Sequence, residues 1–455
     1  APLEFMEEAT SENVVAGMAM GRRSMYQYGK NLARSQRGHV GCGLGKGPAY
    51  GRFTIIEPTE TVGKTGTEMD IDGVRFVFQY TPESEAPAEI LFYLPALKAL
   101  CGAEVLSCNM HNLYTLRGAK VRNALKWSNH INDTIDLFHD AETYFGCHHW
   151  PKWGNKQIVE FLKVQRDTYK YIHDQTVRMF NAGYTPGEIA EEIKLPESLQ
   201  KTFNNRGYYG TLKHNARAVY QAYLGWYDGN PANLDPLPPV ESGRLYVETM
   251  GGADEVLKKA QAFFDKGNYR FAAQLLNHLV FSDSGNTKAR QLLAQTYDQL
   301  GYQAESGPWR NVYLSGANEL RHGGPEKGIS LSSVKDILME TNLSLFFDSM
   351  SVRLNGPKAE GKDITVKMTF KDLNESYELK LENSVLHHRK VTADSPSDAA
   401  IILTHDLFID IVAGDAGIKD TLFSDKLSVE GSKMALVKFF MLFDKPDGTF
   451  NIVTP

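Results

Sequence analysis

The spacing of apolar residues changes twice along the chain, and this change constrains the fold more than any other feature. Between residues 73 and 150, short strand-like apolar runs, of which 73–80 shows the two-residue period, flank one segment of helical spacing at 123–140. From residue 153 to about 322, apolar residues recur at helical spacing, and the two-residue period returns at residue 363. The 455 residues suffice for several hydrophobic cores. We therefore predict an α/β region, an α region and an α+β region in that order.

The first region is predicted to have strands and a helix in one layered unit. The expected strands are "GVRFVFQY" (73–80), "EILFYLP" (89–95), "AEVLSC" (103–108) and "TYFGCHHW" (143–150). A helix is expected over 123–140, between the third and fourth strands. This order is typical of a layered α/β fold.

The middle region is predicted to be helical from residue 153. Thr185 before Pro186 predicts the start of one of these helices. Farther on, Ala260 and Ala294 lie 34 residues apart, as do Gly267 and Gly301. A period of this length resembles a tetratricopeptide repeat. Two units are too few for a solenoid, so a helical bundle packed on a neighbouring part is the alternative to a peptide-binding groove.

The last region is predicted to be a separate α+β domain. The alternating segments 363–372 and 375–383 flank a turn around Asn374 and predict a hairpin. Segment 399–414 is expected to run from a strand into a helix, and 433–444 is a strongly apolar helix. These elements suit a lid over an apolar cavity and an ordinary core equally well.

The composition excludes several classes of protein. The net charge of -6 lacks the basic surplus typical of nucleic-acid binding, and no apolar run approaches the length of a membrane span. Four cysteines without a CxxC pair do not make a disulfide framework. The opening "APLEFMEE" has no basic and apolar leader, so we expect a signal peptide to be absent or already removed.

Ionisable residues gather beside the predicted strands. Glu85, Glu89 and Glu104 lie near strand ends, and His148 and His149 follow the fourth strand. A carboxylate beside a buried strand is costly unless it is paired or bound to a metal, and Glu with His suits zinc. Adjacent histidines in an extended chain point to opposite faces, so only one should reach such a site. Ordinary surface residues are the alternative interpretation.

An arginine near these residues fits an oxyanion. Arg117 lies near the end of the segment "LSCNMHNLYTLRGA" (106–119), and its planar guanidinium suits sulfate or phosphate. A surface ion pair is the alternative. The glycine-rich "RGHVGCGLGKG" (37–47) lacks the GxxxxGK[ST] pattern and is a weak phosphate-loop signal.

Several long motifs resemble one known family. "APAEILFYLP", "AEVLSCNMHNLYTLRGA", "CHHWPKWG", "RGYYGTLKHNARAVYQAYLGWYDGNPANLDPLPP" and "FNIVTP" resemble the zinc-dependent alkyl sulfatases of the metallo-β-lactamase superfamily. The resemblance covers nearly the whole chain. It implies part of a metallo-β-lactamase-like catalytic domain over 1–155, a helical dimerisation domain over 156–322 and a sterol-carrier-like, alkyl-binding domain over 329–455.

The resemblance implies metal ligands. Glu85, Glu104 and His149 match the family's ligand positions, with Glu104 expected to bridge two zinc ions. Glu89 remains the alternative to Glu85, and His148 the alternative to His149.

The resemblance also implies sulfate-binding residues. Asn112 and Arg117 match the segment that surrounds sulfate, and Tyr223 is expected to reach the same pocket. Cys108 and Asn109 depart from the Thr-His-Thr-type run of the family, which puts the surroundings of the metal in question.

One family motif is absent. None of the 13 histidines lies in a Thr-His-x-His-x-Asp-His motif, from which the family draws most of its zinc ligands. The chain therefore resembles the C-terminal two-thirds of such an enzyme. Three interpretations stay open: a processed chain with a separate N-terminal fragment, a shortened form, or a relative that has lost the chemistry.

The expected function is hydrolysis of linear alkyl sulfates, such as dodecyl sulfate, to alcohol and sulfate by water activated on two zinc ions. The alternatives are a non-catalytic carrier of apolar ligands or dimeric scaffold, and another hydrolase such as a lactamase or phosphodiesterase. A homodimer is expected from the helical region. The resemblance favours a periplasmic or secreted location.

Overall fold

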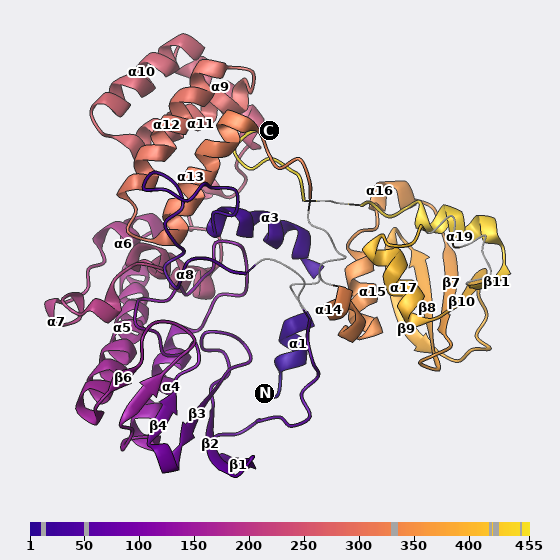
Figure 1. The fold of residues 1–455 in the computed structure, drawn as a ribbon. Coiled ribbons are helices and arrows are strands. Elements are labelled where there is room, and N and C mark those ends of the chain that lie inside the picture. The colour runs from indigo at the N-terminus through magenta and orange to yellow at the C-terminus, as the bar shows by residue number, and fades with distance from the viewer. Residues whose placement is uncertain (11–14, 50–53, 329–334, 418–420, 422–426, 446–447) are drawn as a thin grey trace.

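The computed structural model describes residues 1–10, 15–49, 54–328, 335–417, 421, 427–445 and 448–455. Figure 1 shows a sheet with its helices at one end, a helical array at the other, and a separate α+β part to the side. The N-terminal helices α1 (Phe5–Thr10) and α3 (Gly17–Gln27) lie between these parts. The three predicted regions are therefore present in the predicted order.

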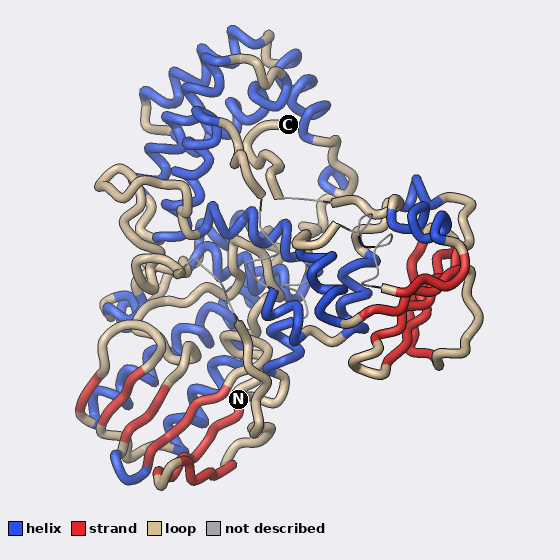
Figure 2. Tube along the Cα trace, turned by 45° about the vertical axis from the view of Figure 1, so that its right-hand side comes forward, coloured by secondary structure: helices blue, strands red, loops and turns tan. Residues whose placement is uncertain are grey.

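The first sheet follows the chain order β1-β2-β3-β4-β5-β6, and all neighbours are antiparallel except β4 and β5, which are parallel. Its strands are β1 (Thr67–Ile71), β2 (Val74–Tyr80), β3 (Ile90–Leu94), β4 (Ala99–Cys101), β5 (Thr143–Phe145) and β6 (Lys152–Trp153). A 3-10 turn, η1 (Pro95–Leu97), joins β3 to β4. Helices α4 (Ala124–Leu137) and α5 (Asn155–Asn181) pack on the sheet, as the tube in Figure 2 shows.

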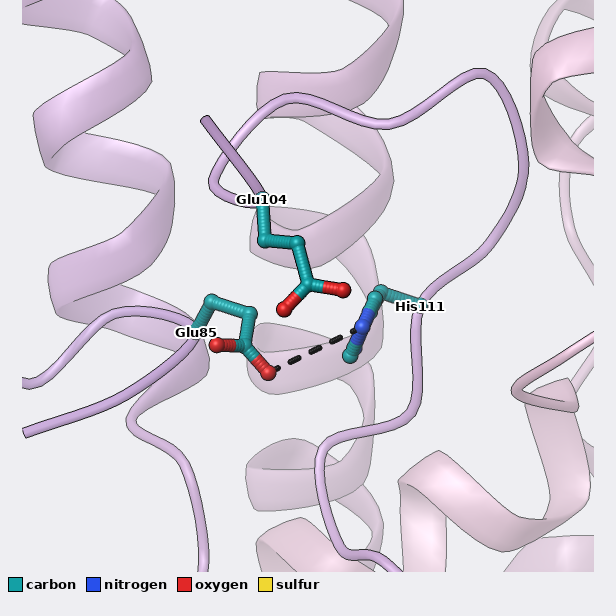
Figure 3. A group of neighbouring side chains, drawn as sticks. All are labelled: Glu85, Glu104 and His111. Atoms are coloured by element: carbon teal, nitrogen blue, oxygen red, sulfur yellow. Dashed lines mark ion pairs between the residues drawn. The ribbon is translucent and has the colours of Figure 1, made fainter. Parts of the chain in front are cut away.

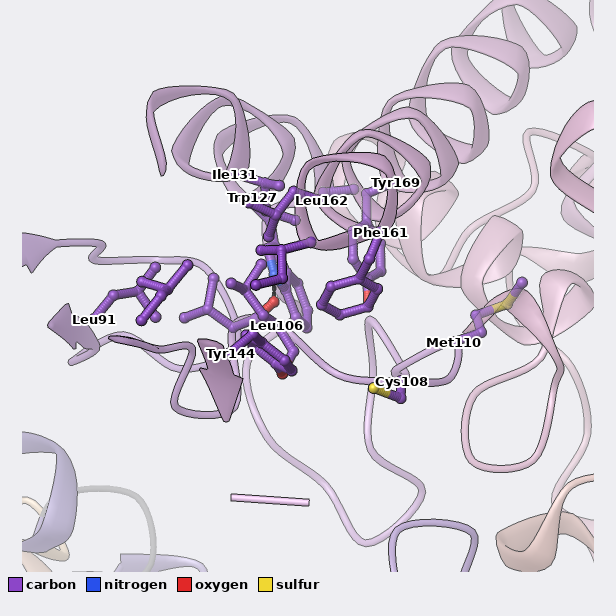
Figure 4. Packing of buried hydrophobic residues seen from close by; sticks show 14 of the residues in the cluster. Leu91, Leu106, Cys108, Met110, Trp127, Ile131, Tyr144, Phe161, Leu162 and Tyr169 are labelled. Atoms are coloured by element: carbon purple, nitrogen blue, oxygen red, sulfur yellow. Dashed lines mark hydrogen bonds between the residues drawn. The ribbon is translucent and has the colours of Figure 1, made fainter. Parts of the chain in front are cut away.

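Trp127 on α4 is the centre of this core (Figure 4). Its side chain is fully buried and stacks on Tyr169 of α5, with ring centroids 4.5 Å apart. The indole Nε1 donates to the carbonyl of Val105 at 2.8 Å. This bond anchors the loop after β4, which carries most of the site described below. Helix α5 buries its apolar face in the same core. The predicted domain boundary near residue 155 therefore lies at the start of a helix that packs in the first unit.

One predicted strand is wrong, and the predicted strand 143–150 is a strand only over Thr143–Phe145. Residues 103–108 form a buried loop, and the strand lies earlier, at Ala99–Cys101. Ala103 has φ 45°, which breaks an extended chain, and Leu106 donates to the carbonyl of Gly102 at 3.0 Å. The apolar run is there because the loop is buried, not because it pairs with a strand.

The helical region is an array of antiparallel pairs. It contains α6 (Pro186–Glu192), α7 (Glu197–Gln200), η2 (Phe203–Asn205), α8 (Leu212–Leu224), η3 (Pro231–Asn233), α9 (Pro239–Thr249), α10 (Ala253–Asp265), α11 (Tyr269–Ser282), α12 (Thr287–Gln303) and α13 (Gly307–His322). Thr185 caps α6 in a capping box with Glu188, as predicted. Ala260 and Ala294 are both fully buried. Gly267 ends α10 at φ 75°, whereas Gly301 lies inside α12, where a Cβ would meet Leu314 at 2.9 Å.

The last part has a five-stranded sheet of order β11-β10-β7-β8-β9, in which β7 and β10 are parallel. Its elements are α14 (Lys335–Glu340), α15 (Leu343–Ser351), α16 (Gly356–Ala359), β7 (Ile364–Phe370), β8 (Glu375–Glu382), β9 (Val385–Val391), β10 (Ala399–Leu403), α17 (His405–Ala413), β11 (Ser428–Gly431) and α19 (Lys433–Phe440). The predicted hairpin is β7–β8, with Asn374 in its turn at φ 53°. Phe347, Phe370 and Phe439 are fully buried in its core.

Two further predictions concern the cysteines and the helices. All four cysteines are free, as expected for a chain without a disulfide framework. Within the described ranges, no helix is both long enough and apolar enough to cross a lipid bilayer.

Candidate metal centre

Three loops meet at one edge of the first sheet because of the strand directions. The loops after β2, after β4 and after β5 all leave that edge, since β3 runs antiparallel to β2 and β4, and β5 runs parallel to β4. They carry Glu85, Glu104 and His148 respectively. The topology therefore brings residues far apart in the sequence to one place.

Glu85, Glu104 and His111 form the candidate metal group (Figure 3). One ligand atom from each lies within 4.8 Å of the others. Glu85 and His111 are buried, at 6% and 1% exposed, and Glu104 is half-buried. One imidazole and two carboxylates are a donor set suited to zinc, with room for a water ligand. The residues present therefore fit such an ion.

The hydrogen bonds and pKa of His111 favour metal binding. Its Nδ1 lies 3.1 Å from the carbonyl of Asn112, and its Nε2 lies 3.7 Å from a carboxylate oxygen of Glu85. With the proton on Nδ1, the lone pair of Nε2 faces the two glutamates. Burial, together with the nearby Arg122 guanidinium, lowers the pKa of His111 to about 3. The imidazole is therefore neutral at physiological pH, which is the form that binds a metal.

The carboxylates have different environments. Burial raises the pKa of Glu85, and the Arg122 guanidinium opposes that shift. Burial also acts against ionisation of Glu104, but its hydrogen bond with His148 lowers the pKa of Glu104 overall. Burial and repulsion by Glu85 and Glu104 raise the pKa of Glu89 well above its usual range. Glu89 lies near the group but is not one of its three members.

The two adjacent histidines have different positions. The imidazole of His148 contacts the carboxylate of Glu104. His149 is exposed, with φ 69°, and is not one of the three grouped residues. The structure thus brings Glu85, Glu104 and His148 together and places His149 outside.

Sequence reasoning missed His111, although one signal was available. His111 lies seven residues after Glu104 and inside the polar run 106–119, which also contains Arg117. A lone histidine on a loop has no motif, and its burial depends on tertiary contacts with Trp127 and Tyr209.

The metal group opens onto a cavity of about 1060 Å³. Its polar wall includes Arg117, Arg122, His148, His173 and Tyr223. Its apolar wall includes Met20, Leu44, Val121, Val219 and Ala222. The cavity therefore places arginine side chains and apolar surface beside the candidate metal group, and the carboxylates of Glu4, Glu7, Glu8 and Glu83 also line it.

The predicted sulfate-binding residues differ in position. Arg117 lines the cavity, and its guanidinium donates to the carbonyl of Gly118 at 3.2 Å. Tyr223 also lines the cavity and is 56% exposed, with its hydroxyl 2.8 Å from Nε2 of His173. Asn112 is 3% exposed, and its side-chain oxygen accepts a hydrogen bond from Arg122.

Gly210 supports the loop that carries His111. A Cβ at this position would lie 2.4 Å from the carbonyl oxygen of His111, well inside van der Waals contact. We expect Gly210→Ala to displace that backbone and to lower zinc affinity about 10-fold, measured by competition with a chelator. Gly187→Ala is the matched control, because its nearest neighbour lies 3.9 Å away. Equal zinc affinity in both variants would contradict this reading of the loop.

The fold and the site define an α/β protein with a candidate metal centre, and comparisons with known proteins identify its family. Family models of alkyl sulfatase dimerisation and of the alkyl sulfatase C-terminal domain match residues 185–323 and 332–455. The chain is 45% identical to a linear primary-alkylsulfatase of Pseudomonas sp., covering 100% of this chain and 68% of that protein. It is also 45% identical to an alkyl/aryl-sulfatase of Saccharomyces cerevisiae, covering 100% and 70%.

A solved structure agrees with these relatives. The stereoselective inverting sec-alkylsulfatase of Pseudomonas sp. superimposes with a TM-score of 0.95 at 41% identity, covering 100% of this chain and 72% of that one. This chain belongs to the alkyl sulfatase family. The resemblance inferred from the motifs is thereby confirmed.

Proposed function

We propose that the protein hydrolyses alkyl sulfates to an alcohol and sulfate at the Glu85–Glu104–His111 group. One observation carries the proposal: this group opens into the same cavity as Arg117 and an apolar wall. An alkyl sulfate has an anionic head and an apolar tail, and the cavity offers a counterpart to each.

The residues of the chain have separate roles in this proposal. Glu85, Glu104 and His111 would hold zinc, which when bound would lower the pKa of a water ligand. We propose that two ions would be held, with Glu104 as a shared ligand, because its carboxylate belongs to the metal group and also contacts His148. We propose His148 rather than His149 as the histidine beside Glu104, because only His148 makes that contact. None of the described side chains is assigned as a proton donor.

Arg117 is proposed to bind the sulfate group. Its guanidinium lines the cavity and donates to the neighbouring carbonyl of Gly118. We expect Arg117→Ala to raise KM for dodecyl sulfate about 10- to 100-fold, because a hydrogen bond to a charged group is lost. The change in kcat should be smaller. Arg75→Ala, which removes an exposed ion pair with Glu68, is the control, and an unchanged KM for Arg117→Ala would exclude the role.

Asn112 and Tyr223 are proposed to act with Arg117. The bond to His173 orients the hydroxyl of Tyr223 at the cavity wall. Asn112 is buried beneath the cavity wall, and its side-chain oxygen accepts a hydrogen bond from Arg122, which lines the cavity.

The alkyl chain and the dimer are assigned to the other parts. We propose linear primary esters as substrates, although the relatives include an (R)-specific secondary-alkylsulfatase of Pseudomonas sp.. Residues 329–455, in a sterol-carrier-like role, would shelter the alkyl tail.

We propose a homodimer through the helical region, whose repeats resemble tetratricopeptide units. Helix α9 in this region exposes Val240 and Tyr246.

A substrate panel tests the function. The purified protein is expected to release sulfate from dodecyl sulfate and to leave a β-lactam and a phosphodiester intact. Binding of dodecyl sulfate without sulfate release would instead indicate a non-catalytic carrier. Hydrolysis of the phosphodiester or the β-lactam in preference would assign another hydrolase activity.

A further inference from the structure

Arg122 connects two of the loops that build the metal centre. Its guanidinium donates from Nε to the backbone carbonyl of Glu85 and from Nη2 to the carboxylate of Glu85. Nη1 donates to the carbonyl of Asn112 at 3.0 Å and to the side-chain oxygen of Asn112. The backbone N–H of Arg122 donates to the backbone carbonyl of Leu113 at 2.8 Å. All three guanidinium nitrogens are therefore used, and the side chain is only 14% exposed.

Arg122 is linked to His111 because both side chains contact the carbonyl oxygen of Asn112. The carbonyl oxygen of Asn112 accepts from Nη1 of Arg122 and also lies 3.1 Å from Nδ1 of His111. Because Arg122 holds the Asn112 carbonyl in place, the hydrogen bond from His111 Nδ1 to that carbonyl orients the imidazole and keeps its proton on Nδ1. The Nε2 lone pair then faces Glu85, whose carboxylate is held by the same guanidinium. Arg122, Glu85, His111 and Asn112 thus form a closed ring of contacts.

We propose that Arg122 is a positioning residue, which orients Glu85 and His111 before the metal binds; this rests on the proposed function of the group. Only a planar fork with several donors can serve the loop of Glu85 and the loop of Asn112 at once. Lysine would keep the positive charge but lose that geometry. Arg117 differs, because its guanidinium bonds the carbonyl of Gly118 instead.

The zinc dissociation constant tests this role independently of activity. We expect Arg122→Lys to weaken zinc binding about 10- to 100-fold, the range for residues that orient metal ligands. Excess zinc should then restore sulfate release, because the ligands themselves remain. Arg75→Lys, which alters an exposed arginine paired with Glu68, is the matched control and is expected to bind zinc as the wild type does.

The outcomes separate this proposal from the proposed function. If the wild type binds no zinc, the function of the group fails. If the wild type binds zinc and a folded Arg122→Lys variant binds it equally well, Arg122 has no positioning role. Should Arg122→Lys fail to fold, Asn112→Ala removes one contact of Arg122 and keeps the backbone carbonyl. A several-fold loss of zinc affinity in that variant supports the proposal, and an unchanged affinity overturns it.

Discussion

Replacing His111 with glutamine is expected to lower zinc affinity and sulfate release by more than about 100-fold, beyond the range seen for residues that only orient ligands. His111 is 1% exposed and contributes one of the three grouped ligand atoms. Glutamine fills a similar volume against Tyr209, whose ring centroid lies 4.9 Å from that of His111. The loss should therefore come from the missing ligand and not from a cavity. Inductively coupled plasma mass spectrometry measures the zinc content.

A control separates this effect from a general effect of losing a histidine. His139 is exposed, two residues after the end of α4, and belongs neither to the grouped residues nor to the lining of the cavity. We expect His139→Gln to keep wild-type zinc content and activity. Full zinc content and activity in His111→Gln would remove His111 from the metal centre.

Replacing Glu319 with alanine is expected to lower the free energy of unfolding by about 3–5 kcal/mol, the cost of leaving a buried charge unpaired. Glu319 on α13 is 4% exposed and pairs with Arg22 on α3, which is 2% exposed. The same carboxylate accepts from the hydroxyl of Tyr26 at 2.8 Å and from the backbone N–H of Ile452 at 2.7 Å. Burial and the Glu319 carboxylate raise the pKa of Tyr26, so the phenol stays neutral and donates. One side chain therefore joins α3, α13 and the closing "FNIVTP" segment.

Urea unfolding followed by tryptophan fluorescence measures this loss. Asp298→Asn is the comparison, because it breaks a more exposed ion pair, with Arg321. That change should cost less than about 1 kcal/mol. Equal losses in the two variants would show that the buried network does not stabilise the protein as described.

Local pattern predicted most of the fold. The segments 73–80, 363–372 and 375–383 alternate because one face of each is buried, and all three contain strands. The segment 103–108 was mispredicted because its burial has another cause. Its carbonyls are satisfied by side chains, those of Val105 and Leu106 accepting from Trp127 and Tyr144 at 2.8 and 2.7 Å. Periodicity cannot distinguish such a loop from a strand.

The site was less predictable because it depends on tertiary contacts. Glu85 and Glu104 attracted attention through their positions near predicted strand ends, where a carboxylate needs a partner. His111 had only the weaker signal of its place in the polar run 106–119, and Arg122 had none, since their roles arise only where the loops converge. For His148 and His149, the sequence predicted that one of them should face the site. The structure places His148 against Glu104 and gives His149 a φ of 69°, which no pattern in the sequence indicates.

Sulfate release from dodecyl sulfate, measured before chelation, after chelation and after zinc is added back, tests the central claim most directly. The zinc content of the same samples is measured in parallel. The account predicts sulfate release that disappears with the zinc and returns with it. Sulfate release that is unaffected by removal of all the zinc, or no release from a fully zinc-loaded protein, would contradict it.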